Sequence, residues 1–282
     1  MGLINNKEII YKNSKSFFWA SKFLSTDILK KVVNIYTFCR LHDDLVDEGV
    51  SLGTAKEIEE LKKTIKKYGV KEKIINQLLD GIKSDINFKR YKSNEDLLRY
   101  CHKVAGIVGI MMVQTIRIKE KEASYFALDL GIAMQLTNIS RDVLEDCKKR
   151  RIYLPENTNI YLETIDNLSS DNKIKIREVV LQILKIADIY YSSSINGIRY
   201  IPLRSRFAIL VALRIYQAIG VKIKKTGTKF LDENIFISRA EKILIIFKTI
   251  IEFIIFFILP LRKKRHNACL HKNLKGLENI HE

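Results

Sequence analysis

Apolar residues recur every three or four positions over most of this 282-residue chain, and no other feature constrains the fold as much. This spacing is the period of an amphipathic α-helix, and no convincing strand-like alternation competes with it. Proline, which interrupts helices, occurs only at Pro155, Pro202 and Pro260. The pattern therefore predicts an all-α protein. The predicted helices cover residues 14–48, 94–119, 123–147, 173–200 and 204–231.

Polar segments separate these ranges and are expected to be loops or helix N-caps. They occupy residues 49–54, 89–96, 155–159 and 167–172. None is long enough to link two domains, and no repeat of solenoid period is present. We therefore expect one helical domain, residues 1–242, followed by a different kind of segment at residues 243–282.

That C-terminal segment begins with the apolar run ILIIFKTIIEFIIFFILPL and continues with the basic cluster RKKR. A spanning helix needs about 20 apolar residues. Lys248 and Glu252 lie near the middle of the run and make spanning costly. Two interpretations stay open. The run forms either a helix in the membrane interface, with the basic cluster at anionic head groups, or the last core helix of the domain.

The chain is strongly basic, with 49 lysines and arginines, 32 acidic residues and a formal net charge of +17. Such a charge attracts nucleic acid, anionic lipid or phosphorylated substrates. No basic recognition helix or stacking platform stands out, so we expect no nucleic-acid binding. The four cysteines lack metal-ligand or disulfide spacing, and the N-terminus lacks a signal core. These features predict a cytoplasmic protein with peripheral contact to the inner face of the membrane.

The segment YTFCRLHDDLVDE, residues 36–48, places polar side chains on one helix face. Its spacings of four, three and four residues join Tyr36, Arg40, Asp43 and Asp47. Two carboxylates one turn apart, flanked by apolar residues, repel each other unless a cation lies between them. Mg²⁺ is the natural cation for such oxygen ligands.

A second polar face occurs far downstream, in QLTNISRDVLEDCKKRRIYLP. Arg141 lies beside this face as Arg40 lies beside the first, and a guanidinium can bind phosphate oxygens with two hydrogen bonds. Two such faces opposite each other in a bundle would hold several Mg²⁺ ions on a diphosphate, with a hydrocarbon chain in the apolar interior. The oxygen-bearing side chains step by three, four and four residues and belong to Gln135, Asn138, Asp142 and Asp146.

The two motifs, DDLVD at 43–47 and NISRDVLED at 138–146, resemble the aspartate-rich motifs of the squalene and phytoene synthase family. Three further segments agree with that family: NSKSFF at 13–18, YCHKVAGIVGIMM at 100–112 and RIYQAIGVKI at 214–223. The resemblance extends from residue 13 to about residue 245. It implies a single-domain isoprenoid-synthase helical bundle with a central cavity.

The resemblance also implies roles for individual residues. The residues implied to bind the metal, directly or through the diphosphate, are Asp43, Asp47, Asn138, Asp142 and Asp146. Substrate contacts fall to Asn13, Ser14, Lys15, Ser16, Tyr36, Arg40, Tyr100, Gln135, Arg141, Arg151 and Tyr216. The catalytic set is Tyr36, Arg40, Asp43, Asp47, Asp142 and Asp146. A core position for Tyr100 and Tyr216, and a helix cap for Arg151, stay open as alternatives.

The activity that the resemblance implies is head-to-head joining of two prenyl diphosphates, with Mg²⁺ or Mn²⁺ as cofactor. Residues 135–146 and 201–223 are more similar to bacterial phytoene synthases than to squalene synthases. This favours geranylgeranyl diphosphate as substrate, a cyclopropylcarbinyl diphosphate intermediate, and phytoene as product without NADPH. The step would be the first committed one of carotenoid biosynthesis, with a handover to a downstream desaturase.

Two alternatives stay open. Within the family, the chain would make squalene or dehydrosqualene from farnesyl diphosphate. Outside the family, a basic helical protein that binds membrane or nucleic acid without catalysis explains the net charge, although it does not explain two acidic faces on apolar helices.

Overall fold

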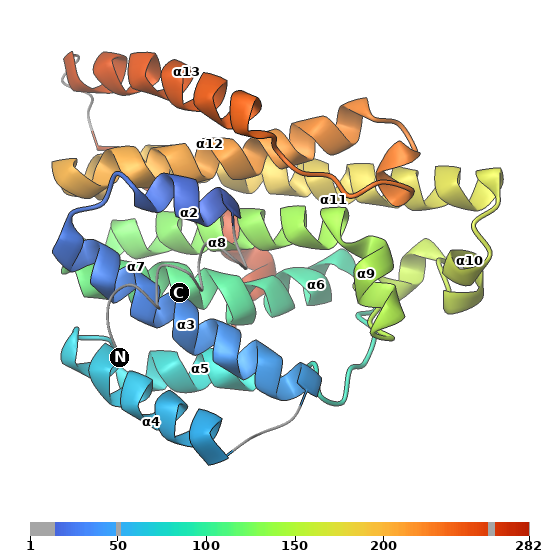
Figure 1. The fold of residues 1–282 in the computed structure, drawn as a ribbon, viewed down its shortest axis with the longest axis horizontal. Coiled ribbons are helices and arrows are strands. Elements are labelled where there is room, and N and C mark those ends of the chain that lie inside the picture. Colours follow the sequence, from blue (N-terminus) through green and yellow to red (C-terminus); the bar gives the residue numbers. More distant parts are fainter. Residues whose placement is uncertain (1–14, 49–51, 259–262, 282) are drawn as a thin grey trace.

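The computed structural model describes residues 15–48, 52–258 and 263–281, with the side chains at 15–16, 47–48, 52–53 and 256–258 outside the description. Within these ranges the chain forms helices and no strand, which confirms the predicted all-α fold. Figure 1 shows them as one bundle. The α-helices are α2 (Lys15–Ser21), α3 (Thr26–Glu48), α4 (Leu52–Lys67), α5 (Glu72–Lys83), α6 (Asn94–Cys101), α7 (Ile107–Ile116), α8 (Lys121–Arg141), α9 (Val143–Lys148), α10 (Leu162–Asp166), α11 (Ser170–Gly197), α12 (Leu203–Lys225) and α13 (Arg239–Ile258). One π-helical segment, η1 (His102–Gly106), and four 3₁₀ helices lie between or after them: η2 (Glu156–Thr158), η3 (Ile198–Tyr200), η4 (Lys229–Leu231) and η5 (Ala268–Leu274).

The predicted helices correspond to observed ones, with differences in detail. The helix predicted over 14–48 is interrupted by a turn at residues 22–25, and α4 and α5 lie outside the predicted ranges. Two of the polar breaks contain N-caps as expected. Ser93 accepts a hydrogen bond from the Asp96 amide, and Ser169 accepts one from the Asn172 amide. These caps fix where α6 and α11 begin.

Helix α8 lies in the middle of the bundle and packs against α7, α11 and α12 (Figure 1). Two glycines, Gly109 and Gly131, allow α8 to lie very close to α7 and η1. A Cβ atom on Gly109 would lie 2.2 Å from the Ala127 carbonyl oxygen, and one on Gly131 would lie 2.2 Å from that of Ala105. Both distances are far below van der Waals contact, so any larger residue would force α7 and η1 away from α8. This packing fixes the two walls of the cavities described below.

Helix α13 lies along α12, and the chain then returns across α6 (Figure 1). Arg99 on α6 donates hydrogen bonds from Nη1 to the carbonyl oxygens of Asn273, at 3.3 Å, and Lys275, at 2.9 Å. No helix in the described part of the chain is long and apolar enough to cross a membrane. The division of the chain at residue 242 stays a prediction.

Candidate active site

Helix α3 forms one wall of a polar cavity of about 530 Å³, lined in part by Arg40 and Asp43. The polar face predicted at residues 36–48 therefore lines the same cavity as side chains from other helices. Arg40 also pairs with the neighbouring acid, because its Nη2 atom lies 2.5 Å from Oδ1 of Asp44, one turn along the helix. The side chain of Asp47 lies outside the described residues, so its role stays a prediction.

Tyr36, one turn before Arg40, lies beside this cavity. Its ring stacks on that of Phe17 from α2, with 5.7 Å between the centroids. Burial raises the pKa of Tyr36 to about 12, and the nearby Tyr216 hydroxyl adds to the effect. The structure thus brings Tyr36 and Tyr216 together, with Tyr36 protonated at neutral pH.

The second wall comes from the end of α8 and from α9. The helix predicted over 123–147 is divided at Asp142, where the backbone leaves helical geometry with φ −101° and ψ 17°. The amide of Asp142 still donates to the Asn138 carbonyl, and that of Asp146 to the Asp142 carbonyl, both at 2.8 Å. Because both bonds span four residues, the three side chains keep one face and line the same cavity.

Several carboxyl groups crowd together on this wall. Burial and then the carboxylate of Asp142 raise the pKa of Asp146 to about 8, and Glu145 and Asp85 act in the same direction. The buried Oδ1 atom of Asn138 has no hydrogen-bond partner among the described residues. Crowded carboxylates and an unsatisfied amide oxygen are the donor set that a hard divalent cation binds. The residues therefore fit Mg²⁺.

The floor of the cavity contains two residues that the sequence did not single out, Asp85 and Tyr153. The Tyr100 hydroxyl donates to Oδ2 of Asp85 at 2.8 Å and lies 3.2 Å from the Tyr153 hydroxyl. The Tyr100 and Tyr153 rings stack with 5.2 Å between their centroids. Tyr100 is thus both part of the cavity wall and a buried aromatic residue with a satisfied hydroxyl. Asp85 follows α5 without an acidic partner at helical spacing, so no local pattern marks it.

Cations line the cavity beside the carboxylates. Arg150 adopts the left-handed conformation, with φ 58°, and this turn ends α9. The next residue, Arg151, donates its amide to the Asp146 carbonyl at 2.9 Å and directs its side chain into the cavity wall together with Lys149. Four cationic side chains therefore face the cavity, from Arg40, Arg141, Lys149 and Arg151.

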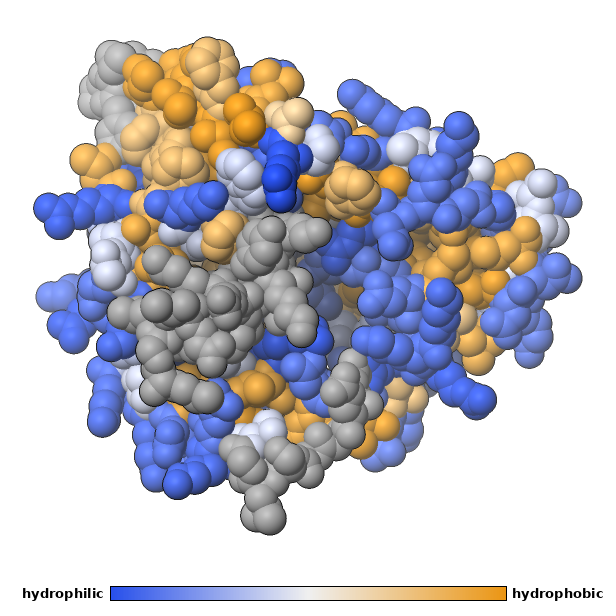
Figure 2. Space-filling view, in the orientation of Figure 1, coloured by the Kyte–Doolittle hydropathy of each residue, from blue (hydrophilic) through white to orange (hydrophobic). Residues whose placement is uncertain are grey.

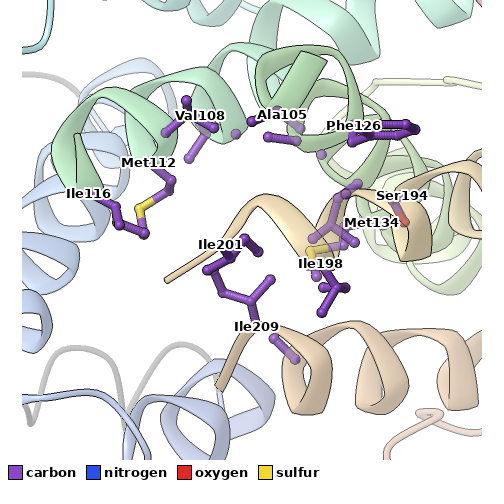
Figure 3. Close-up of a pocket in the computed structure, with 18 of the residues that line it drawn as sticks. Ala105, Val108, Met112, Ile116, Phe126, Met134, Ser194, Ile198, Ile201 and Ile209 are labelled. Carbon is purple, nitrogen blue, oxygen red and sulfur yellow. The ribbon is translucent and has the colours of Figure 1, made fainter. Parts of the chain in front are cut away.

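A second, apolar cavity of about 250 Å³ lies within the bundle. Figure 3 shows side chains from α7, such as Val108 and Met112, pointing across it toward Ile198, Ile201 and Ile209. The residues of α8 that line the apolar cavity follow one another at helical spacing from Ala123 to Asn138. This stripe is about 22 Å long at 1.5 Å per residue. Gln135 and Asn138 line both cavities, so the apolar cavity adjoins the polar one.

The structure therefore brings most of the predicted site residues together. The polar cavity is lined by Arg40, Asp43, Tyr100, Gln135, Asn138, Arg141, Asp142, Asp146 and Arg151. Tyr36 and Tyr216 lie next to each other beside it. Asn13 and Ser14, and the side chains of Lys15, Ser16 and Asp47, fall outside the described residues.

A helical bundle with this pair of cavities has the shape and polarity that suit an apolar chain ending in an anionic group. Residues 10–63 and 52–241 match the family model for squalene/phytoene synthase, and the chain belongs to this family. The proposed family resemblance is thereby confirmed.

Curated relatives are similar over most of the chain. A 15-cis-phytoene synthase from Paracoccus sp. is 30% identical over 86% of this chain and 88% of its own length. One from Enterobacter agglomerans is 31% identical over 82% of this chain and 88% of its own. Among solved structures, a dehydrosqualene synthase in complex with ligand superposes with a TM-score of 0.74 at 26% identity, covering 88% of this chain and 95% of that one.

Proposed function

We propose that this protein is a phytoene synthase, which joins two geranylgeranyl diphosphates head to head to form 15-cis-phytoene. The observation that carries the proposal is the junction at Gln135 and Asn138, where a cavity rich in carboxylates and cations adjoins an apolar one. A prenyl diphosphate has the same two parts. Relatives named 15-cis-phytoene synthase, similar over most of the chain, support this choice of substrate and product.

The proposed cofactor is Mg²⁺, with Mn²⁺ as a substitute, held by Asp43, Asn138, Asp142 and Asp146, together with Asp47. When bound, the metal neutralises charge on the diphosphate as it leaves. The cations of the cavity would bind the remaining phosphate oxygens, and a planar guanidinium suits this task best. The adjoining apolar walls would hold the prenyl chains and keep water from the reacting carbons.

The reaction then follows in two ionisations. The C–O bond of one substrate breaks, and the diphosphate leaves with the bonding electrons. The double bond of the second substrate attacks the resulting cation, and loss of a proton gives a cyclopropylcarbinyl diphosphate. This intermediate loses its own diphosphate, rearranges and loses another proton. The product is a C40 hydrocarbon with a central triene, so no hydride donor is needed.

A second candidate is dehydrosqualene synthesis from farnesyl diphosphate, which is favoured by the structural similarity to a dehydrosqualene synthase. The test is incubation of the purified protein with each diphosphate and Mg²⁺, with and without NADPH, followed by chromatography and mass analysis. We expect phytoene from geranylgeranyl diphosphate without reductant. A C30 hydrocarbon as the preferred product would favour the second candidate, and turnover of neither substrate would contradict both.

We also propose that α13 attaches the protein to the membrane surface. Its outer face exposes large apolar side chains, and Figure 2 shows this apolar surface at the top of the molecule. Glu252 is turned inward, where its carboxylate accepts hydrogen bonds from Arg214 on α12. Of the two charged residues in this helix that oppose contact with lipid, Lys248 and Glu252, the pairing neutralises Glu252. The exposed face consists of Ile243, Leu244, Phe247, Ile250, Ile251, Ile254 and Ile255.

Exposed basic residues, among them Lys263 and Lys264, follow α13 and suit anionic head groups. The helix therefore combines both earlier interpretations, since its inner face packs on α12. An apolar product would leave such a site for the lipid phase, where a downstream desaturase would receive it. We place the protein in the cytoplasm, on the inner face of the membrane.

A further inference from the structure

Three of the five histidines of the chain lie in its last described segment, residues 263–281, and two of them contact one buried carboxylate. Asp129 is on α8, and its side chain is 0% exposed. Nε2 of His266 lies 2.7 Å from Oδ2 of Asp129, and Nε2 of His271 lies 2.9 Å from Oδ1. Both histidine side chains are also 0% exposed. One carboxylate thus orients two imidazole rings.

The hydrogen bonds fix which ring nitrogens carry protons. A carboxylate only accepts, so both Nε2 atoms donate to Asp129, and a neutral ring then keeps a lone pair on Nδ1. The single charge of Asp129 can balance at most one protonated ring. Nδ1 of His266 lies 2.8 Å from Nε2 of His281. Nδ1 of His271 is buried and has no hydrogen-bond partner among the described residues. A buried nitrogen without a partner is unfavourable unless something binds it.

The third ring completes a compact set of nitrogen atoms. One ring nitrogen from each of His266, His271 and His281 lies within 4.8 Å of those of the other two. We propose that His266, His271 and His281 bind one Zn²⁺ ion, through Nδ1, Nδ1 and Nε2 respectively.

The chemistry of the cluster selects a transition metal. Imidazole nitrogen suits Zn²⁺, whereas Mg²⁺ requires oxygen ligands, so this site and the carboxylate cavity take different ions. A ligating histidine usually donates its other N–H to a carboxylate, and Asp129 accepts from two of them. Asp129 does not line either cavity, although its neighbours Ala127 and Leu130 line the apolar one. The zinc site is thus separate from the proposed active site and does not rest on the proposed function.

The position of the cluster indicates a structural role. Residues 263–281 contain only one short 3₁₀ helix, η5, and few of their side chains are buried. Individual hydrogen bonds join the segment to the bundle, such as Tyr190 Oη to the Leu270 carbonyl at 3.1 Å and His102 Nε2 to the Glu278 carbonyl at 3.1 Å. A zinc ion would join three points of this segment to one another, above the α8 carboxylate that orients two of the ligands. Three protein ligands leave one coordination position for water.

The test uses full-length protein without a histidine tag, stripped with a chelator and kept in excess Mg²⁺ to occupy oxygen sites. Zn²⁺ binding is measured by calorimetry, and Co²⁺ serves as a spectroscopic substitute. We expect one Zn²⁺ per chain, tetrahedral Co²⁺ absorption bands and a higher Tm with Zn²⁺. A wild-type protein that binds neither ion stoichiometrically and whose Tm does not change would overturn the proposal.

Variants locate the ion. His281→Ala removes a ligand near the end of the chain, and we expect it to abolish stoichiometric binding and the Zn²⁺-dependent rise in Tm. Cys269→Ala removes the exposed thiol of the same segment, and His102→Gln removes a buried imidazole outside the cluster. Both should bind Zn²⁺ as the wild type does, and so should Asp142→Asn in the carboxylate cavity. Unchanged affinity in a folded His281→Ala protein would also overturn the proposal.

Discussion

Arg141 holds both carboxylate oxygens of the residue that follows it, Asp142. Its Nε atom donates to Oδ1 at 2.7 Å and its Nη2 atom to Oδ2 at 2.5 Å. The two side chains are only 29% and 26% exposed, so water screens the pair weakly. Arg141 therefore orients a proposed metal ligand, in addition to the phosphate contact that the sequence predicts. A lysine would keep the charge but could not form both bonds.

This geometry predicts the effect of Arg141→Lys. Loss of one of the two bonds would leave Asp142 poorly oriented, and changes in groups that orient metal ligands typically cost about 10–100-fold in affinity or activity. We expect the Mg²⁺ concentration for half-maximal phytoene formation to rise by a comparable factor, as measured from initial rates in a Mg²⁺ titration. Arg150→Lys, at an exposed neighbouring position, is the matched control. Equal Mg²⁺ curves for wild type and Arg141→Lys would contradict the orienting role.

Asp146→Asn tests the metal site itself. This substitution removes a carboxylate whose pKa is raised to about 8, mainly by burial and then by Asp142. The crowded wall would lose its repulsion, so the apo protein should be no less stable. Activity should fall about 100-fold or more, because metal stabilisation of the leaving group contributes several kcal/mol. The measurement is the rate of phytoene formation together with a thermal melt. Glu178→Gln, exposed on α11, serves as the control.

The sequence predicts the two acidic faces because each repeats at helical spacing within a single segment. It cannot place residues whose role arises from tertiary packing. Asp85 stands alone in its segment and enters the site through its hydrogen bond from Tyr100. His266 and His281 lie far from Asp129 in sequence, and no metal-binding spacing marks them. Likewise, apolar spacing continues through residues 22–25, so periodicity alone does not reveal the turn between α2 and α3.

Ala127→Phe should shorten the preferred substrate. Ala127 faces the apolar cavity from α8, eleven residues before Asn138, which is about 16 Å along the helix. A phenyl ring there would fill the distal part of the cavity while leaving the part near Gln135 open. We expect the ratio of kcat/KM for geranylgeranyl over farnesyl diphosphate to fall at least about 10-fold. Ala127→Ser should leave the ratio close to the wild-type value. An unchanged ratio in Ala127→Phe would mean that chain length is set elsewhere.

Phe247→Ser and Ile251→Asn should weaken membrane attachment. These side chains are 61% and 49% exposed on α13, so replacing them should change the stability of the fold little. Each buried apolar side chain is worth about 1.5–3 kcal/mol. We therefore expect binding to anionic vesicles, measured by cosedimentation, to fall about 10-fold or more per substitution. Ile86→Asn, at a 55% exposed position beyond α5, is the control. Equal binding by all three variants would contradict the role of α13.

We expect buried His102 to make the folded protein less stable in mild acid than at neutral pH. Burial lowers the pKa of His102 from 6.5 to about 4, while its Nε2 hydrogen bond to the Glu278 carbonyl opposes the shift. The unfolded chain takes up a proton on His102 more readily than the folded chain does. The contribution of neutral His102 to the free energy of unfolding is therefore fully present above the unfolded pKa of 6.5 and is lost as the pH drops toward 4. The full loss amounts to about 3 kcal/mol.

His102→Gln keeps an N–H donor for the Glu278 carbonyl but does not titrate. Urea unfolding at pH 7 and pH 5, with a chelator present, should therefore show a smaller acid-induced loss in the variant than in the wild type. All other titratable groups are common to the two proteins, so their contributions cancel in the difference. If both lose the same unfolding free energy between the two pH values, buried His102 is not the group that makes the fold acid-sensitive.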